Sequence, residues 1–217
     1  MNLFLKSYWA ETKTFFPEVF TKVKSAIRIK NACIVGGADG KFVIPLLQKG
    51  IFTTVIEKDT SALNGCVVEF PKGVKSWMPG LYENISSENL EGLAEIHTTD
   101  FMLFETLRQY DLVFTSCSWH YSFNYNTPVP AFVEKMQQLV KPSGIFAAEY
   151  MMPCGDEKSK HPNYLKEGEL KSMFDSNWEI VTEKYTDVFE ENPHVGNLEQ
   201  HKHRMGFLIA IKNINNK

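Results

Sequence analysis

The sequence predicts an α/β protein built on one mostly parallel β-sheet, and two observations carry this prediction. Apolar stretches typical of buried strands alternate with helical patterns as far as Met151, and such alternation is typical of βαβ units. Beyond Gly168, two strand patterns follow each other without a long helix between them, which predicts an antiparallel end to the sheet.

Seven strands are expected from short apolar stretches that are rich in β-branched residues. They lie at residues 32–36, 52–59, 93–100, 110–117, 144–151, 178–189 and 203–212. We expect the order 3-2-1-4-5-7-6, with strand 7 antiparallel and helices on both faces of the sheet.

Helical patterns, in which apolar residues recur every three to four positions, lie between these strands. Helices are expected at 41–50, 128–140 and 167–174. The stretch 64–92 contains Pro71, Gly73, Pro79 and Gly80, and we expect a helix plus a loop there.

Length and composition favour one domain with a sizeable core, because 43% of the 217 residues are apolar. We expect a single domain over 1–217, with an N-terminal helical segment at 1–28 and a catalytic core at 29–212. The net charge of −3 offers no basic surface for nucleic acid. No apolar run reaches the roughly 18 residues that span a bilayer, and the N-terminus lacks a signal-peptide pattern. The four widely spaced cysteines predict reduced thiols in a cytoplasmic protein and no zinc site.

The stretch VGGADGKF, residues 35–42, predicts a tight turn between the first strand and the first helix. Gly36, Gly37 and Gly40 allow the backbone of this turn to approach a ligand closely. In an open parallel sheet, ligands bind beyond the carboxyl ends of the strands. The turn is therefore the first part of a predicted binding site.

Two further strand ends complete the pattern of an adenosine site. Glu57 ends the second strand, 21 residues after Gly36, where an acid can accept both hydroxyls of a ribose. Asp100 and Phe101 follow the third strand, where a carboxylate can accept an exocyclic amine and a ring can cover adenine. Each feature alone is common, but the three in this order predict an adenosine-containing ligand.

These motifs resemble those of class I S-adenosylmethionine-dependent methyltransferases over nearly the whole chain. VGGADGKF is similar to the glycine-rich first motif, VIEKDTSAL to the ribose motif and TTDF to the adenine-contacting stretch. YDLVFTSCSWHY resembles the fourth-strand motif, and LVKPSGIF resembles the entry to the fifth strand, which nicotinamide dehydrogenases do not share. More narrowly, YLKEGELKSMFDSNWEIV and KHRMGFLIAIK are similar to the tellurite-resistance methyltransferase subgroup.

The resemblance implies a Rossmann-like fold, S-adenosyl-L-methionine as the cofactor and a set of cofactor-binding residues. These residues are Gly36, Gly37, Ala38, Asp39, Gly40, Glu57, Lys58, Asp100, Phe101, Ser116 and Cys117.

Three positions depart from the pattern of that family. Ile34 occupies the place of an acid that usually helps hold the methionine amino group, and Ala38 replaces the middle glycine. Pro153 lies near the place of an acid that often follows strand five, although Glu149 lies within that strand. A relative that binds the cofactor without turnover is therefore a second hypothesis. A nicotinamide-dependent reductase is a third, against which KPSG and the antiparallel end of the sheet argue.

Two aromatic segments are candidates for the side of the site that binds the methyl acceptor. Residues 7–16, with Tyr8 and Trp9, either fold over the cofactor as a lid or form an amphipathic helix against the sheet. After strand four, His120 is a candidate base and Tyr121 a candidate orienting hydroxyl, with Trp119 as a pocket wall. The alternative makes Trp119 and Tyr121 part of the core or of the pocket wall and stacks His120 on adenine.

A third candidate segment surrounds the last strand. His201 and His203 share one face and can bind a metal, but a solvated hairpin tip is the favoured interpretation and no metal site is predicted. The subgroup resemblance implies that Arg204 points inward and that a histidine near His194 is catalytic.

We therefore expect a small-molecule acceptor, either an N, O or S atom of a metabolite or a metalloid oxyanion. The candidate catalytic residues are His120, His194 and Arg204, and the candidate acceptor-binding residues are Tyr8, Trp9, Trp119, Tyr121 and His203.

Overall fold

The computed structural model describes residues 7, 14–22, 28–70, 73–121, 124–155, 161–191 and 198–214. These residues fall into two compact units. The first is drawn from residues 1–13, 30–104 and 190–201, and the second from residues 14–29, 105–189 and 202–217.

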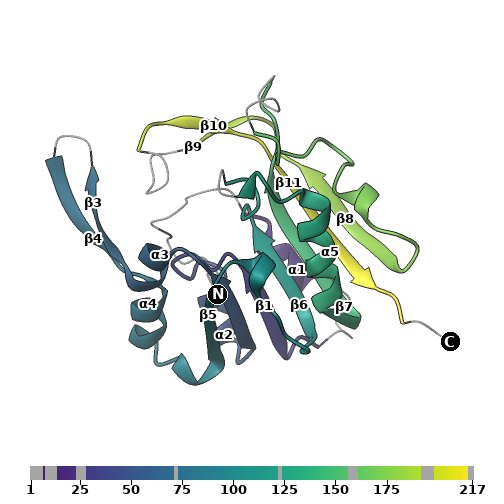
Figure 1. The fold of residues 1–217 in the computed structure, drawn as a ribbon, viewed down its shortest axis with the longest axis horizontal. Coiled ribbons are helices and arrows are strands. Elements are labelled where there is room, and N and C mark those ends of the chain that lie inside the picture. The colour runs from purple at the N-terminus through teal and green to yellow at the C-terminus, as the bar shows by residue number, and fades with distance from the viewer. Residues whose placement is uncertain are drawn as a thin grey trace. The chain divides into compact units, whose positions relative to one another are not determined.

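Seven strands form one sheet in the order β5-β2-β1-β6-β7-β11-β8, labelled in Figure 1. Their bounds are β1 Asn31–Val35, β2 Phe52–Glu57, β5 Ala94–Thr98, β6 Tyr110–Ser116, β7 Val140–Met151, β8 Trp178–Tyr185 and β11 Met205–Lys212. Strand β2 pairs in parallel with β1 and β5, and β6 pairs in parallel with β7. Strand β11 runs antiparallel to both β7 and β8. The predicted order and the antiparallel last strand are confirmed.

In the first unit, three helices accompany β1, β2 and β5: α2 (Val43–Gln48), α3 (Thr60–Asn64) and α4 (Leu81–Ser87). Short 3₁₀ helices lie at Glu91–Leu93 and Phe101–Leu103. Helix α2 buries the five residues from Val43 to Leu47, and the last four residues of β1 are buried too. The predicted helix after the first strand is therefore present and begins two residues later than expected.

A β-hairpin occupies part of the stretch where a helix plus a loop was expected. Strands β3 (Cys66–Phe70) and β4 (Val74–Met78) pair antiparallel, and only α4 matches the expected helix. The chain comes close to itself at the base of this hairpin, where a Cβ on Gly80 would lie 2.2 Å from the Gly65 nitrogen. Figure 1 shows the hairpin projecting beyond α3 and α4. Gly65 and Gly80 therefore mark the base of the hairpin, and Gly73 lies in the turn between its strands.

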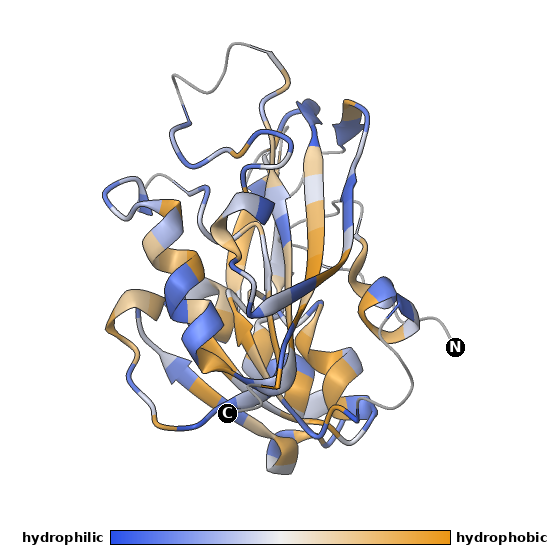
Figure 2. Ribbon diagram, turned by 90° about the vertical axis from the view of Figure 1, so that its right-hand side faces the viewer, coloured by the Kyte–Doolittle hydropathy of each residue, from blue (hydrophilic) through white to orange (hydrophobic). Residues whose placement is uncertain are grey.

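In the second unit, α1 (Phe16–Lys22) and α5 (Val129–Leu139) accompany β6, β7, β8 and β11. Helix α5 agrees with its predicted range and buries Phe132 and Met136 on one face. Phe16 of α1 is 2% exposed and packs against Phe114 of β6, with the ring centroids 4.6 Å apart. Apolar residues predominate along the central strands in Figure 2.

The helix expected at 167–174 is wrong. The structure has turns there and a single 3₁₀ helix at Lys171–Met173. Gly168 has a φ of 75°, a left-handed backbone conformation that an α-helix cannot contain.

Two further strands, β9 (Phe189–Glu191) and β10 (His201–His203), pair as a small sheet of their own. None of the helices in the described part of the chain is long and apolar enough to cross a membrane.

Candidate active site

The turn after β1 belongs to the first unit and is as tight as the glycine pattern predicts. Gly36 and Ala38 both have positive φ, at 77° and 44°. The Gly36 N–H donates to the Ile56 carbonyl at 2.9 Å, which ties the turn to β2. A Cβ on Gly37 would lie 2.3 Å from the Val55 Cγ1, so no side chain fits between the turn and that strand.

The carboxylate of Glu57, at the end of β2, holds this turn by hydrogen bonds. Its Oε2 accepts the Ala38 N–H at 2.9 Å. Its Oε1 accepts the N–H groups of Lys58 and Asp59 at 2.8 and 2.9 Å. A carboxylate offers about four lone-pair positions, so these three bonds leave Glu57 capacity to accept a hydroxyl. The glycine-rich motif and the ribose motif of the sequence therefore meet at the Glu57 side chain.

Asp100 and Lys58 were predicted as separate cofactor contacts, and the structure joins them in an ion pair. The Lys58 Nζ lies 2.7 Å from the Asp100 Oδ2, with both side chains partly exposed. The Asp100 Oδ1 accepts the Met102 N–H at 2.8 Å and so caps the 3₁₀ helix that begins at Phe101. Phe101 itself is 5% exposed.

Asp39 is buried beneath the turn, where it has two partners that the sequence pattern did not identify. The Ser7 hydroxyl donates to its Oδ1 at 2.8 Å, and the Asn84 side-chain amide donates to its carbonyl at 2.7 Å. Ile34, in the place of the usual acid, is fully buried within β1.

In the second unit, Glu149 of β7 is a fully buried carboxylate with several donors around it. Its Oε1 accepts the Thr14 hydroxyl and the N–H groups of Phe15 and Phe16. Its Oε2 accepts the Ser116 hydroxyl at 2.7 Å. This side chain thus links the N-terminal segment to the end of β6. The signal in the sequence was its position as the single charged residue in the apolar stretch 144–151.

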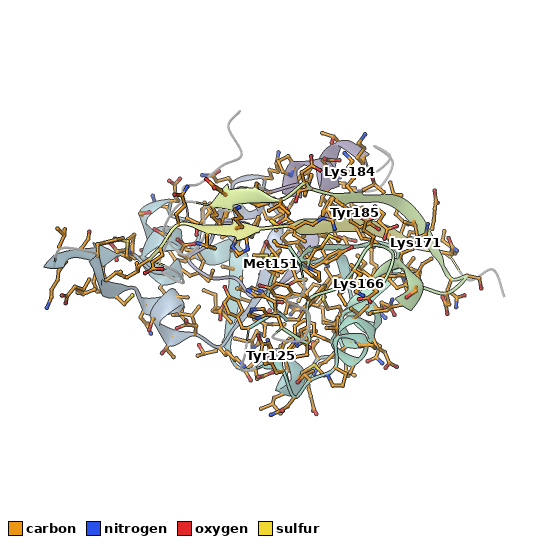
Figure 3. The ribbon with its side chains drawn as sticks, turned by 90° about the horizontal axis from the view of Figure 1, so that it is seen from above. Tyr125, Met151, Lys166, Lys171, Lys184 and Tyr185 are labelled. Carbon is orange, nitrogen blue, oxygen red and sulfur yellow. The ribbon has the colours of Figure 1, made fainter. Side chains whose placement is uncertain are left out.

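Cys117 follows β6 with a φ of 55°, which is uncommon for a residue other than glycine. Its N–H donates to the Glu149 carbonyl at 2.8 Å. Its thiol belongs to a buried cluster with Met151, Tyr164 and Met205; Met151 of this cluster is labelled in Figure 3. The turn that carries the candidate base is therefore anchored on β7.

His120 lies at this turn, half-buried between tyrosine rings. Its ring lies 4.2 Å from the Tyr121 ring and 6.0 Å from the Tyr164 ring, centroid to centroid. Its Nδ1 is hydrogen-bonded to the Cys117 carbonyl, which can only accept, so Nδ1 carries the proton and Nε2 keeps a lone pair. Burial lowers the pKa of His120 to about 4, although the bond to Cys117 opposes this shift. The imidazole is therefore neutral at pH 7 and able to accept a proton at Nε2.

Trp119 and Tyr121, both predicted to bind the acceptor, differ in their surroundings. Trp119 is 1% exposed and packs against Phe132 of α5 and Tyr150 of β7. This burial favours the alternative in which Trp119 belongs to the core. Tyr121 is 46% exposed, so it is not part of the core.

Arg204 lies between β10 and β11, and its guanidinium is held by other groups of the second unit. Its Nε donates to the Thr186 carbonyl at 3.2 Å, and its terminal nitrogen forms an ion pair with Glu167. His203 lies beside the Phe189 ring, 6.2 Å between centroids. The inward arginine implied by the subgroup resemblance is thus engaged with an exposed carboxylate. Tyr8, Trp9 and His194 lie outside the described residues.

The predicted residues therefore gather in two groups, one in each unit. Residues 36–40, Glu57, Lys58, Asp100 and Phe101 belong to the first unit. Ser116, Cys117, His120, Tyr121 and Arg204 belong to the second.

We compared the sequence and the structure of the chain with those of known proteins. No protein-family model matches the chain, and no curated protein matches its sequence. The structure is similar to TehB from Haemophilus influenzae, a tellurite-resistance methyltransferase, with 18% identity and a TM-score of 0.66. That match covers 93% of this chain, which spans only 64% of the TehB chain. The fold is that of class I methyltransferases.

Two further solved structures have the same fold and a similarly low sequence identity to this chain. A sarcosine dimethylglycine methyltransferase assigned in Galdieria sulphuraria has 12% identity and a TM-score of 0.63, over 92% of this chain and 84% of that one. The N-methyltransferase NodS from Bradyrhizobium japonicum WM9 has 12% identity and a TM-score of 0.58, over 92% and 94%. NodS has also been solved in complex with S-adenosyl-L-homocysteine. The family resemblance seen in the sequence is confirmed at the level of the fold.

Proposed function

We propose that this protein is an S-adenosyl-L-methionine-dependent methyltransferase that acts on a small-molecule acceptor. The observation that carries the proposal is the bond between the Glu57 carboxylate and the Ala38 N–H, which joins the acid of the second strand to the glycine turn. Open α/β sheets bind nucleotides at such strand ends. The fold shared with TehB and NodS supports the same conclusion.

The residues of the first unit suit the nucleoside part of this cofactor. The remaining acceptor capacity of Glu57 suits a ribose hydroxyl, and the lack of a side chain at Gly36 and Gly37 leaves the turn open to close approach. When bound, the cofactor supplies a methyl group on a positively charged sulfur that leaves as a neutral thioether. We propose that Gly36, Gly37, Ala38, Asp39, Gly40, Glu57, Lys58, Asp100 and Phe101 hold it, with Ser116 and Cys117 as further contacts.

On the acceptor side, His120 is the proposed general base. Its Nε2 can take a proton from a nucleophile that is protonated at working pH, because the hydrogen bond to Cys117 keeps the proton on Nδ1. Its lowered pKa of about 4 means that it does not need to lose a proton first. We further propose that Tyr121, His203, Tyr8 and Trp9 contact the acceptor and that His194 is an alternative base.

The structurally similar enzymes support the proposal that the methyl acceptor is a small molecule. NodS is an N-methyltransferase, and a coclaurine N-methyltransferase with N-methylheliamine and S-adenosyl-L-homocysteine bound has 10% identity and a TM-score of 0.59 to this chain. We propose that the methyl group is accepted by an N, O or S atom of a metabolite or by a metalloid oxyanion. None of the four cysteines, all of which lie within the described residues, forms a disulfide, and this suits the cytoplasmic location expected from their spacing.

One observation favours a second function, that of a protein which binds the cofactor without turnover. Ile34 is fully buried where the family usually has an acid for the methionine amino group. Such a protein would bind S-adenosyl-L-homocysteine and S-adenosyl-L-methionine but release no product with any acceptor.

Calorimetric titration with S-adenosyl-L-methionine, S-adenosyl-L-homocysteine and NAD separates the candidates. We expect both sulfur ligands to bind and NAD not to bind. Release of S-adenosyl-L-homocysteine is then followed with amines, thiols, phenols and metalloid oxyanions as acceptors. Binding of NAD alone would overturn the proposal, and binding of the sulfur ligands without turnover on any acceptor class would favour the second function.

A further inference from the structure

Two buried oxygen atoms of the second unit lack hydrogen bonds, and the proposed methyl transfer uses neither of them. They are the hydroxyl of Tyr150 on β7 and the Oε1 of Glu183 on β8, and neither has a partner within the part of the chain that the structure describes. Tyr150 is fully buried, and the side chain of Glu183 is 15% exposed. Buried polar groups normally have a partner, because burial has removed the water that solvated them. These two atoms therefore mark a candidate binding site that is open to solvent at Glu183.

The register of three strands directs the Tyr150 hydroxyl toward Tyr185 and Glu183. Tyr150 pairs with Gly206 of β11, and Gly206 pairs with Tyr185 of β8, so these three residues share one face of the sheet. Because Gly206 has no side chain, the end of the Tyr150 ring lies over it: a Cβ on Gly206 would be 2.6 Å from the Tyr150 hydroxyl oxygen. The hydroxyl thus extends over β11 toward β8, where Glu183 lies two residues before Tyr185 on the same face.

Tyr185, labelled in Figure 3, adds a third oxygen atom to this group. Its hydroxyl accepts the Gly168 N–H at 2.8 Å, and a hydroxyl oxygen has a second lone pair for another donor. Burial raises the pKa of Tyr185 to about 12, and the Glu183 carboxylate adds to this shift. The pKa of Tyr150 is raised as well, first by burial and then by Tyr185 and Glu183. Both hydroxyls are therefore neutral at pH 7, and the charge of the group is the negative charge of Glu183.

The surrounding charges favour a cation at this group. The carboxylates of Glu167 and Glu169 also lie close enough to Tyr150 to raise its pKa. Lys171 approaches Glu183, but its Nζ lies 4.0 Å from the other carboxylate oxygen, Oε2, and its side chain is 56% exposed. The Oε1 that lacks a hydrogen bond therefore remains available to a positively charged donor.

We propose that the oxygen atoms of Tyr150, Glu183 and Tyr185 bind the protonated primary amino group of a small molecule. A primary ammonium group has three N–H donors and no acceptor, and each of the three oxygens can accept one of these donors. Hydrogen bonds between an ammonium group and a carboxylate are charge-assisted and stronger than neutral ones. The site binds the amine whether or not a methyl donor is present.

The test is a ligand-observed NMR titration of the full-length protein with butylammonium chloride, without a methyl donor. Two comparison ligands are titrated in the same way: 1-pentanol, which has no charge, and tetramethylammonium chloride, which has no N–H donor. We expect saturable binding of butylammonium in the millimolar range and at least ~10-fold weaker binding of both comparison ligands.

Two variants of the site and one control make the test specific. Tyr150→Phe removes only a hydroxyl that has no partner in the described chain, so it should be at least as stable to urea as the unaltered protein while binding butylammonium ~10-fold or more weakly. Glu183→Gln keeps the shape of the side chain and loses its charge, and it should weaken binding by the same factor. Glu179→Gln, at an exposed glutamate of the same strand, should bind as the unaltered protein does.

Four results would each overturn the proposal. They are absence of saturable butylammonium binding to the unaltered protein, unchanged affinity in a folded Tyr150→Phe or Glu183→Gln variant, an equal loss of affinity in Glu179→Gln, and equal affinity for butylammonium and 1-pentanol. Because the two site variants remove different groups, the test stays decisive if one of them folds poorly.

Discussion

Glu57 and Glu149 act in the same way in the two units, because each carboxylate accepts N–H groups of a neighbouring turn. Glu57 takes the Ala38 N–H, and Glu149 takes those of Phe15 and Phe16. Hydrogen bonds to a charged group contribute ~1.5–3 kcal/mol each to stability. The first residue could be predicted because it ends a strand next to a glycine turn. The partners of the second lie more than 130 positions away in the sequence, where no local pattern reveals them.

We expect Glu149→Gln to lower the free energy of unfolding by ~1.5–3 kcal/mol, because the charge that the three donors of residues 14–16 share is lost. Urea unfolding measures this change. Glu179→Gln, an exposed glutamate on β8 of the same unit, is the control and should change the stability little. Equal stability of both variants would mean that Glu149 does not hold the N-terminal segment.

His120 gives the protein a pH dependence of defined sign. Its pKa in the folded state is about 4, below the ordinary value of 6.5, and the main cause is burial. Between these two pH values the unfolded chain binds more protons than the folded one, so the stability is full above pH 6.5 and falls as the pH approaches 4. The loss attributable to this group is up to ~3 kcal/mol.

Urea unfolding at pH 7.5, 6 and 5 tests this dependence. In His120→Gln the decline between pH 7.5 and pH 5 should be smaller by ~2 kcal/mol, because pH 5 still lies one unit above the folded-state pKa. In His97→Gln, a substitution of a histidine on β5, it should persist. An identical decline in the His120 variant and the unaltered protein would show that this imidazole is not neutralised by burial.

At the scale of elements, the turn after β1 depends on the absence of a side chain at Gly37. A methyl group there would lie 2.3 Å from Cγ1 of the fully buried Val55, and a valine in a strand has little rotamer freedom to move away. Gly37→Ala should therefore cost ~1–3 kcal/mol of stability, measured by chemical denaturation.

Gly92→Ala is the matched control for this substitution. Neither glycine has a positive φ, and a Cβ on Gly92 would meet no atom within 4 Å. This variant should be as stable as the unaltered protein or slightly more stable. If both variants unfold at the same denaturant concentration, the turn does not pack against β2 as described.

The elements with a regular apolar period could be predicted from the sequence, and those interrupted by glycine could not. The seven strands and α5 lie within a few residues of the predicted ranges. The β3–β4 hairpin was missed because its glycines and proline indicate a loop as readily as the ends of strands. The helix at 167–174 was wrong because a φ of 75° at Gly168 depends on long-range packing, including a bond from its N–H to the Tyr185 hydroxyl at 2.8 Å.

For the whole molecule, the strand order could be predicted because it follows from few physical rules. Parallel strands need helical crossovers, and a step without a helix produces an antiparallel neighbour. The positions of the site residues on strand ends followed from the same rules. Their ion pairs did not, because Lys58 with Asp100 and Arg204 with Glu167 join residues about forty positions apart. The periodic patterns of a sequence extend over a few residues and do not reveal contacts between residues so far apart.

We propose that the first unit holds the nucleoside of a methyl donor through Glu57. This role is tested by calorimetry with S-adenosyl-L-homocysteine on the unaltered protein, Glu57→Gln and Glu88→Gln. Glu88 is an exposed glutamate of the same unit at the end of α4, where it contacts Gln48. Loss of one charged hydrogen bond to a ribose hydroxyl corresponds to a ~10- to 100-fold weaker affinity. We predict that loss in Glu57→Gln, with its fold verified by circular dichroism, and none in Glu88→Gln. Unchanged affinity in a folded Glu57→Gln variant would mean that Glu57 does not bind the ribose of the cofactor.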